Sequence, residues 1–276
     1  MDTTQMMLLA ALQGVTELFP ISSLGHSVLV PALLGWHINR DAPAFLPFLV
    51  VLHVGTASAL LAYFWRDWWQ ILRGFVRARG GMSNPEARLL WLLAVASVPA
   101  GLIGLVLEKR LRLLFGGFVI VVIFLALNGI GLLVGDLLRR RKARHEPASM
   151  GFGKAIIIGF AQALALIPGM SRSGATLVAG LGTGLDYEAS ARFSFLMATP
   201  IIAAAALLEI PKLFRQGLDV PLGPIFAAGL LAAGFAYLST WFLMRYFRGH
   251  EQKALRPFGF YCLGLAAFAL VWHFRH

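Results

Sequence analysis

Long apolar runs with few or no charges recur from one end of the chain to the other. Six of them are each about long enough to cross roughly 30 Å of hydrocarbon as an α-helix. They occupy residues 42 to 65, 89 to 107, 113 to 135, 193 to 210, 220 to 244 and 257 to 274. The pattern predicts an all-α integral membrane protein with six transmembrane helices.

Two further apolar segments, residues 6–35 and 155–185, behave differently. As one straight helix, a segment of this length would extend about 45 Å and overshoot the hydrocarbon core. Each segment is also broken in the middle, at Pro20 and at Pro168-Gly169, where proline removes a backbone donor and disfavours helix in the residue before it. Such a segment can enter and leave the membrane on the same side, so we predict two re-entrant helix hairpins.

The two broken segments also resemble each other in sequence. Residues 13–26 and 162–176 both run from Gln through an apolar turn to Pro, and then to Ser and Gly. Each segment precedes three spans, an odd number, so two re-entrant hairpins would place the second copy upside down relative to the first. We therefore predict one membrane domain, residues 1–276, built as an inverted-topology repeat of residues 1–140 and 150–276.

If both segments instead cross the membrane fully, the two copies are parallel. The distribution of Lys and Arg among the loops is compatible with either topology. The re-entrant arrangement brings both Ser/Gly breaks to the bilayer midplane, where unwound backbone is tolerated only around a buried site or an aqueous cavity. This chemical argument favours re-entrant hairpins.

Composition and charge narrow the class of protein further. Hydrophobic residues make up 58% of the chain and charged residues 13%, which excludes an ordinary soluble protein. The net charge of +11 comes from Lys and Arg that fall mostly in short loops between apolar runs, such as residues 66–88. The positive-inside rule explains that placement without a nucleic-acid partner. A single cysteine, Cys262, excludes a disulfide scaffold.

Two charged residues lie deep within the broken segments, Glu17 and Arg172. Each costs about 2.5 to 3.5 kcal/mol at a helix centre on insertion scales, and such a cost requires compensation. One interpretation is a structural ion pair that ties the two repeats together. The other is a functional site, which the neighbouring hydroxyls, imidazole and helix breaks favour.

The residues around the two breaks suit phosphate. Ser22 or Ser23 could cap a half-helix that runs towards Leu34, and Ser171 or Ser173 could cap another that begins near Gly174. Capping alone is a sufficient role for any single serine here. Two half-helix N-termini that point at a common centre, however, present free N–H groups and positive dipole ends, which favour an anion.

Other polar side chains can reach the same point. Arg172 offers a fork of donors that binds phosphate oxygens bidentately. Gln13 and Glu17 are four residues apart and share a helical face. His26 lies one turn after Ser23, where it could relay a proton or orient the hydroxyl. His53 is a weaker candidate, for which we expect a packing or helix contact.

Residues 17–26, ELFPISSLGH, together with residues 168–176, PGMSRSGAT, resemble the two signature segments of the undecaprenyl-diphosphatase family, also known as the bacitracin-resistance proteins. The resemblance extends over essentially the whole chain. It implies six spans plus two inverted re-entrant helix pairs, in agreement with the pattern above. Gln13 and Glu17 fit the version of the motif that begins with Gln, so the two-carboxylate arrangement of some members is absent here. Leu24 departs from the motif, because Thr is common at this position.

The resemblance implies an enzyme that removes the terminal phosphate from undecaprenyl diphosphate. The product, undecaprenyl phosphate, is the carrier lipid of peptidoglycan synthesis, and its recycling confers bacitracin resistance. The resemblance further implies a multi-pass protein of the inner (cytoplasmic) membrane, a site that opens to the periplasm, and support of activity by Mg²⁺ or Ca²⁺.

On this basis each candidate residue has an expected role. We expect Ser23 to be the nucleophile, His26 to relay a proton or orient Ser23, and Glu17 to act as a base or metal ligand. The remaining candidates are expected to hold the substrate: Arg172, Ser22, Ser171, Ser173, Thr176 and Gln13. Attack by a metal-bound water, with Ser23 only positioning phosphate, is the alternative mechanism.

Two other functions remain open from the sequence alone. Inverted repeats with broken helices are also a transporter design, so a carrier or flippase for an anionic polyprenyl-phosphate headgroup is one alternative. A membrane scaffold with a buried ion pair is the other. Expected partners are the polyprenyl substrate and membrane lipids, without nucleic acid, and the oligomeric state is open between a monomer and a homodimer.

Overall fold

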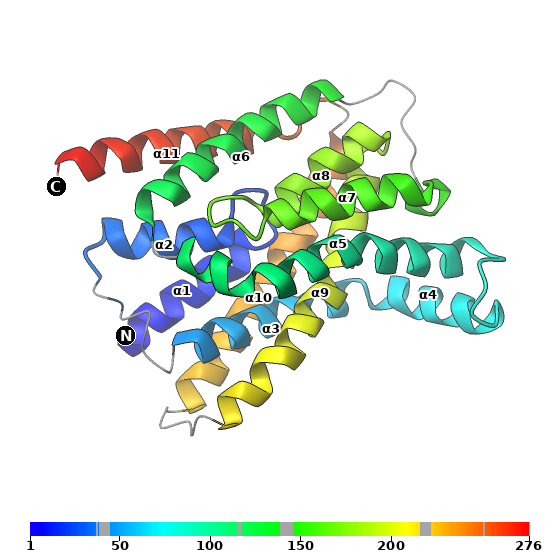
Figure 1. The fold of residues 1–276 in the computed structure, drawn as a ribbon, viewed down its shortest axis with the longest axis horizontal. Helices are drawn as coiled ribbons and strands as arrows, with labels where there is room; N and C mark the ends of the chain where they lie inside the picture. The colour runs from blue at the N-terminus through cyan, green and yellow to red at the C-terminus, as the bar shows by residue number, and fades with distance from the viewer. Residues whose placement is uncertain are drawn as a thin grey trace.

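The computed structural model describes residues 1–36, 38, 45–114, 117–138, 146–215, 222–250 and 252–275. Within these ranges the regular structure is entirely helical (Figure 1). The α-helices are α1 (Thr3–Thr16), α2 (Ser23–Leu33), α3 (Phe45–Tyr63), α4 (Trp65–Arg77), α5 (Pro85–Leu114), α6 (Phe118–Leu138), α7 (Phe152–Leu164), α8 (Arg172–Thr183), α9 (Tyr187–Arg215), α10 (Leu222–Gly249) and α11 (Arg256–Arg275). A short 3₁₀ turn, η1 (Pro147–Ser149), precedes α7. The predicted all-α class is confirmed.

Four helices in the described ranges are long and apolar enough to cross a membrane, and they lie in α5, α6, α10 and α11. A fifth span is formed if the bent pair α3 and α4 counts as one. The predicted span at residues 193–210 lies inside α9, a helix of 29 residues, and the side chains of residues 205–215 lie outside the described part of the chain. The protein is therefore a multi-pass helical membrane protein.

One segment expected to be a loop is helical. Residues 66–77 belong to α4, which is bent by 73° from α3 at Phe64, and Arg88 lies in the first turns of α5. The loop was predicted from the arginines alone, although the apolar residues of this stretch follow a helical spacing. Trp68, Ile71 and Phe75 recur at intervals of three and four residues and face inward.

The two broken segments form the predicted helix pairs. α1 and α2 are separated by turns at residues 17–21, and α7 and α8 by turns at residues 165–169. Figure 1 shows the α1–α2 hairpin on the left and the α7–α8 hairpin on the right, with their connecting turns meeting near the centre of the molecule. The two helix breaks are thus brought together.

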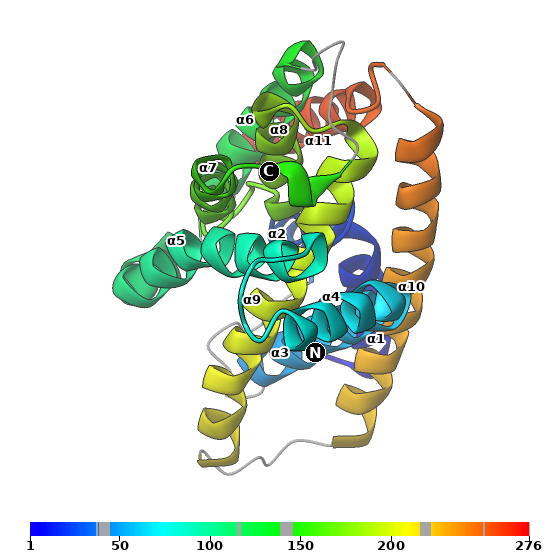
Figure 2. The ribbon, with the colours of Figure 1, turned by 90° about the vertical axis from the view of Figure 1, so that its right-hand side faces the viewer.

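The helices of each hairpin pack on helices from the other half of the chain. α1 packs on α10 and α7 packs on α5, whereas α2 contacts both α6 and α11, and α8 packs on both α6 and α9. Figure 2 shows α5 and α10 at opposite sides of the molecule, with α9 between them. Each hairpin therefore docks mainly against helices of the other half of the chain, and α9 fills the middle.

Candidate active site

The first turns of α2 and α8 are built alike. Ser22 caps α2 by accepting a hydrogen bond from Gly25 N at 3.1 Å, and Ser171 caps α8 by accepting one from Gly174 N, also at 3.1 Å. These contacts decide between the serines left open by the sequence. Because the two caps correspond, the first helical residues also correspond: Ser23 in α2 and Arg172 in α8.

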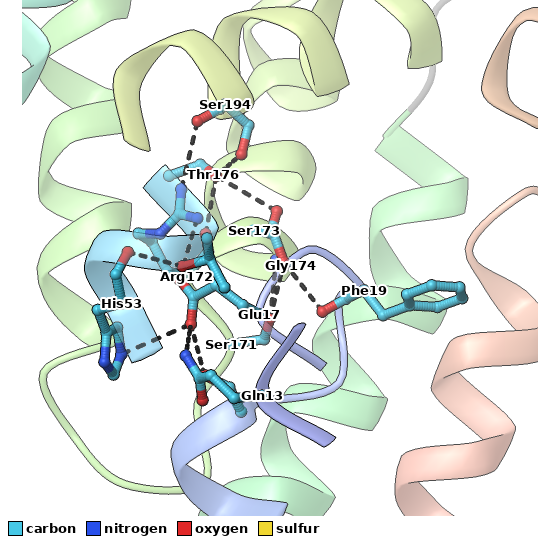
Figure 3. A network of polar contacts seen from close by, with 12 residues as sticks. Gln13, Glu17, Phe19, His53, Ser171, Arg172, Ser173, Gly174, Thr176 and Ser194 are labelled. Atoms are coloured by element: carbon cyan, nitrogen blue, oxygen red, sulfur yellow. Dashed lines mark hydrogen bonds and ion pairs between the residues drawn. The ribbon is translucent and has the colours of Figure 1, made fainter. Parts of the chain in front are cut away.

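Both of these residues bind the same carboxylate. Ser23 Oγ donates to Glu17 Oε2 at 2.7 Å, and Arg172 Nη2 lies 3.3 Å from Glu17 Oε1 (Figure 3). Gln13 Nε2 also donates to Glu17 Oε2, at 3.1 Å, from the preceding turn of α1. Glu17 is 9% exposed, so its charge is compensated by donors from both hairpins rather than by water.

The guanidinium of Arg172 bridges towards α9. Its Nη1 donates to the Ser194 carbonyl oxygen at 3.3 Å. Thr176, one turn further along α8, donates its hydroxyl to the Arg172 carbonyl oxygen, and its Oγ1 lies 2.6 Å from Ser194 Oγ. The buried Nε–H of Arg172 has no hydrogen-bond partner among the described residues. One donor of the fork thus remains available.

The turn of the first hairpin is tied to α8 and α6. Ser173 Oγ donates to the Phe19 carbonyl oxygen and lies 3.1 Å from Ser171 Oγ. The buried Asn128 of α6 donates to the Pro20 carbonyl oxygen at 2.9 Å and accepts from Ser171 N at 3.1 Å. A single amide therefore joins both helix breaks and fixes their separation.

His26 faces away from this cluster. Its Nδ1 lies 2.7 Å from the Ser22 carbonyl oxygen, and its Nε2 lies 2.8 Å from Tyr261 Oη on α11. The two rings are stacked, with an interplanar angle of 5°. Within the described contacts Ser23 bonds to Glu17 and not to His26, so the geometry that led us to pair Ser23 with His26 is absent from this conformation.

His53 is closer to the site than the sequence suggested. Its Nδ1 lies 2.8 Å from the Leu49 carbonyl oxygen, which orients the ring within α3. Its Nε2 lies 3.8 Å from Glu17 Oε2, and its side chain is 27% exposed. Figure 3 shows the imidazole pointing towards Glu17. The expected helix contact is present, but it orients His53 towards the site.

Three residues of the cluster were missed or underrated by sequence reasoning: His53, Asn128 and Ser194. His53 and Asn128 each place a polar side chain in an otherwise apolar span, a feature that by itself suggests function in a membrane protein. Ser194 carried no such signal, because small hydroxyl residues are common in buried helices.

The repeat is not chemically symmetric. Gln162 of α7 corresponds to Gln13, but Leu166 stands four residues later, where the first copy has Glu17. Gln162 is buried, and neither polar atom of its side chain has a partner within the described residues. The site therefore combines a carboxylate from one copy with an arginine from the other.

A small cavity adjoins the cluster. Its volume is about 10 Å³, room for about one water molecule. It is lined by Leu9, Leu12, Gln13, Ser23, Ser27, Phe45, Leu49 and Leu52. The cavity is polar at Gln13 and Ser23 and apolar elsewhere, between α1, α2 and α3. A ligand larger than a water molecule can enter only if this space widens.

The donor set limits how a divalent cation could bind. The described residues contain no group of three or more His, Cys, Asp or Glu able to hold a metal ion. Glu17 supplies one carboxylate, and Mg²⁺ is commonly bound through one or two carboxylates together with substrate phosphates and water. The residues fit a cation that is shared with a bound phosphate ligand, with Glu17 as its protein ligand.

The fold and the site define a multi-pass helical membrane protein whose two broken helix pairs meet at a buried, charge-paired centre suited to an anion. The profile of the family "Bacitracin resistance protein BacA" matches residues 6–268. The chain belongs to this family.

Whole-length relatives agree. An "Undecaprenyl-diphosphatase 2" of Chromobacterium violaceum is 57% identical over 273 residues, which cover 99% of each chain. An "Undecaprenyl-diphosphatase 2" of Burkholderia thailandensis is 51% identical over 271 residues, 97% of this chain and 96% of the relative. An "Undecaprenyl-diphosphatase" of Acidiphilium cryptum is 50% identical over 272 residues, 96% of this chain and 95% of the relative.

Proposed function

We propose that the protein hydrolyses undecaprenyl diphosphate to undecaprenyl phosphate and inorganic phosphate. Family membership over residues 6–268 and relatives with that activity in their names support the substrate. The observation from the site that supports it best is the unpartnered, buried Nε–H of Arg172 beside two half-helix N-termini. These groups suit the phosphate oxygens of a lipid whose tail stays in the membrane.

Phosphate would be held at the junction of α2 and α8. The N–H groups at the start of both helices and the free donor of Arg172 bind oxygens of the diphosphate, while Ser171, Ser173 and Ser22 keep the two turns in place through their caps and carbonyl contacts. Gln13 and Thr176 position Glu17 and Arg172 respectively. Negative charge that develops in the transition state is met by donors that are already oriented.

Ser23 is the proposed nucleophile, with Glu17 as its base. Ser23 Oγ already donates to Glu17 Oε2 at 2.7 Å, so its proton can pass to the carboxylate as Oγ attacks the terminal phosphorus. The bond from that phosphorus to the bridging oxygen breaks, and undecaprenyl phosphate leaves with the electron pair. Glu17 passes the Ser23 proton to the departing lipid phosphate. Water then attacks the phosphorus of the phosphoserine, Glu17 accepts a proton from that water and returns it to Ser23 Oγ, and inorganic phosphate leaves.

Glu17 would hold a Mg²⁺ or Ca²⁺ ion when one is bound, and such an ion would supply positive charge that stabilises the leaving phosphate. His26 would act only indirectly in this scheme, since both ring nitrogens are engaged by Ser22 and Tyr261. A role in proton relay would require the ring to turn away from Tyr261.

The alternative mechanism is direct attack by water on the terminal phosphorus. Glu17 would activate the water, and Ser23 would only contact the phosphate.

We further propose the complete topology of six spans and two re-entrant hairpins in inverted copies, residues 1–140 and 150–276. The hairpins approach from opposite sides in Figure 1, and the exchanged packing of α1 on α10 and α7 on α5 is what a two-fold relation between the copies produces. The basic loops would face the cytoplasm and the site would open to the periplasmic side of the inner membrane.

The experiment that tests the function is phosphate release by purified protein in detergent from undecaprenyl diphosphate, followed with and without a chelator of divalent cations. Release of one phosphate per lipid supports the proposal. Intact substrate after prolonged incubation would reject it. Movement of labelled headgroups across vesicles without any hydrolysis would favour the carrier function, for which the two helix breaks that meet near the centre of the molecule are the specific observation.

A further inference from the structure

Helix α4 carries three distinct faces. Its inward face consists of Asp67, Trp68, Ile71, Gly74 and Phe75, all buried or half-buried. Two exposed stripes and the exposed Gln70 make up the remainder of the helix. Because an α-helix has 3.6 residues per turn, the exposed side chains line up in two stripes. One stripe is apolar and consists of Trp65, Trp69, Leu72 and Val76. The stripe beside it is basic and consists of Arg66, Arg73 and Arg77.

The inward face of α4 packs against α5 and contacts α9. The Asp67 carboxylate pairs with Arg192 of α9. Gly74 lies so close to α5 that a Cβ atom added there would come within 2.5 Å of Glu86 Cβ. α4 is thus fixed in rotation about its own axis, and the two exposed stripes point away from the bundle.

The exposed arginines are uncompensated. Asp67, the only acidic residue of α4, is engaged by Arg192, and no carboxylate among the described residues pairs with Arg66, Arg73 or Arg77. The Arg66 guanidinium lies 5.4 Å from the ring centre of Trp65, over its face. The outer surface of α4 therefore presents a positive stripe along the edge of an aromatic and aliphatic one.

This arrangement matches the boundary between acyl chains and headgroups. α4 turns 73° away from α3, so if α3 crosses the bilayer, α4 lies closer to the membrane plane than to its normal. Tryptophan prefers the interface, and arginine beside it reaches lipid phosphates. An interfacial helix has one apolar side in the acyl boundary and a basic side at the headgroups.

We propose that α4 is an interfacial helix whose arginine stripe, Arg66, Arg73 and Arg77, binds the headgroups of anionic phospholipids. The apolar stripe sits in the acyl boundary of the same leaflet. Each arginine near an anionic surface contributes about 1 kcal/mol, roughly a fivefold preference over neutral lipid. The occupant is a lipid surface and not a protein, because the apolar and basic stripes run parallel along the helix, as a planar interface requires. The inference does not depend on the proposed hydrolysis.

The test uses the whole protein with a reporter on α4. In a Cys262→Ala background, Val76→Cys carries an environment-sensitive fluorophore, and the protein is reconstituted in phosphatidylcholine vesicles that contain 10 mol% of either brominated phosphatidylglycerol or brominated phosphatidylcholine, about one lipid in ten by design. We expect stronger quenching by the anionic lipid. The same label at Met82→Cys, in the turn after α4, reports a position off the stripe.

Charge variants assign the preference to α4. Arg73→Gln with Arg77→Gln should bring the ratio of quenching by the two lipids to about one, whereas Arg245→Gln with Lys253→Gln removes two exposed cations elsewhere and should leave the ratio unchanged. Size-exclusion chromatography and thermal unfolding check that each variant is folded.

A Val76 probe that stays in water and is quenched by neither lipid would overturn the proposal and leave α4 as a surface for a soluble partner. An unchanged lipid preference in the α4 variant, or an equal loss in the control pair, would also overturn it.

Discussion

At the residue scale, the site depends on one carboxylate that is shared among several donors. Glu17 is held by Ser23, Gln13 and Arg172, and His53 lies nearby. Each of these contacts compensates a charge that would be costly in the membrane interior. We propose that the same donors turn to a phosphate when the substrate binds, so that one set of side chains both compensates Glu17 and recognises an anion.

The two adjacent serines should behave differently. Ser23→Ala is expected to lower turnover by about 10³-fold or more while substrate binding persists, because it removes the attacking oxygen. Ser22→Ala removes only the cap of α2 and should cost about 1 kcal/mol of stability. Phosphate-release kinetics of both variants, side by side with their thermal unfolding, provide the measurement.

Substantial turnover by Ser23→Ala would transfer the role of nucleophile to water. Ser23 would then keep only its contact with Glu17 or with phosphate. A large loss of activity in Ser22→Ala without loss of stability would instead show that the two serines had been assigned in the wrong order.

Sequence reasoning identified the residue types of the site but not all of their contacts. The convergence of Glu17 with Arg172 followed from their cost in the membrane, and the capping serines followed from helix starts. The direction of His26 could not be predicted, because residues three apart on a helix can meet but need not, and Tyr261 lies 235 positions away in the chain. Partners from distant helices also explain why Asn128 and Ser194 were missed.

At the scale of elements, close helix contacts rest on glycine. A Cβ at Gly129 of α6 would lie 2.8 Å from the Gly259 carbonyl oxygen of α11 and 3.0 Å from Leu263 Cγ. Gly131, on the same helix, has nothing within 4 Å of such an atom. Small residues let helix backbones approach in a membrane protein, so the packing of α6 on α11 depends on the first glycine and not on the second.

Alanine at these two positions makes a matched pair. Gly129→Ala should lower the free energy of unfolding by about 1–3 kcal/mol, since α11 must shift to admit the methyl group. Gly131→Ala should be neutral or stabilising by up to about 1 kcal/mol, because alanine has the higher helix propensity. Thermal unfolding in detergent compares them, and equal Tm values for the two variants would contradict the close packing of α6 and α11.

The apolar runs predicted most helices, because a span must satisfy its own backbone hydrogen bonds. The exception was α4, where arginines obscured a helical pattern on the opposite face. A charge count separates loops from spans, but it does not distinguish a loop from a helix that lies outside the hydrocarbon. The inward spacing of Trp68, Ile71 and Phe75 was the signal that could have found it.

At the scale of the whole molecule, the two halves of the chain meet through their hairpins. The proposed inverted topology places Leu34, at the end of α2, outside and Ser83, between α4 and α5, inside. In a Cys262→Ala background, Leu34→Cys should react with an impermeant thiol reagent in cells whose outer membrane is permeable, whereas Ser83→Cys should react only after the inner membrane is opened. Both positions are exposed in the structure.

Labelling of Leu34→Cys only from the cytoplasm would contradict this orientation. Labelling of both positions from the same side would contradict the crossing of α3 between them. The sequence shows that an odd number of predicted spans follows each broken segment. It does not show on which side each hairpin opens, because the loop charges fit either topology.

The central claim is that the diphosphate is bound where Arg172 of one half meets Glu17 of the other. Arg172→Lys keeps the charge but removes the fork, including the unpartnered Nε–H, so phosphate release should fall about 100-fold or more. Arg192→Lys, which alters a partly exposed arginine paired with Asp67, should retain most activity. The most direct measurement is phosphate release from undecaprenyl diphosphate by these two folded variants in parallel. Near-normal release by Arg172→Lys, or an equal loss in both variants, would contradict the account.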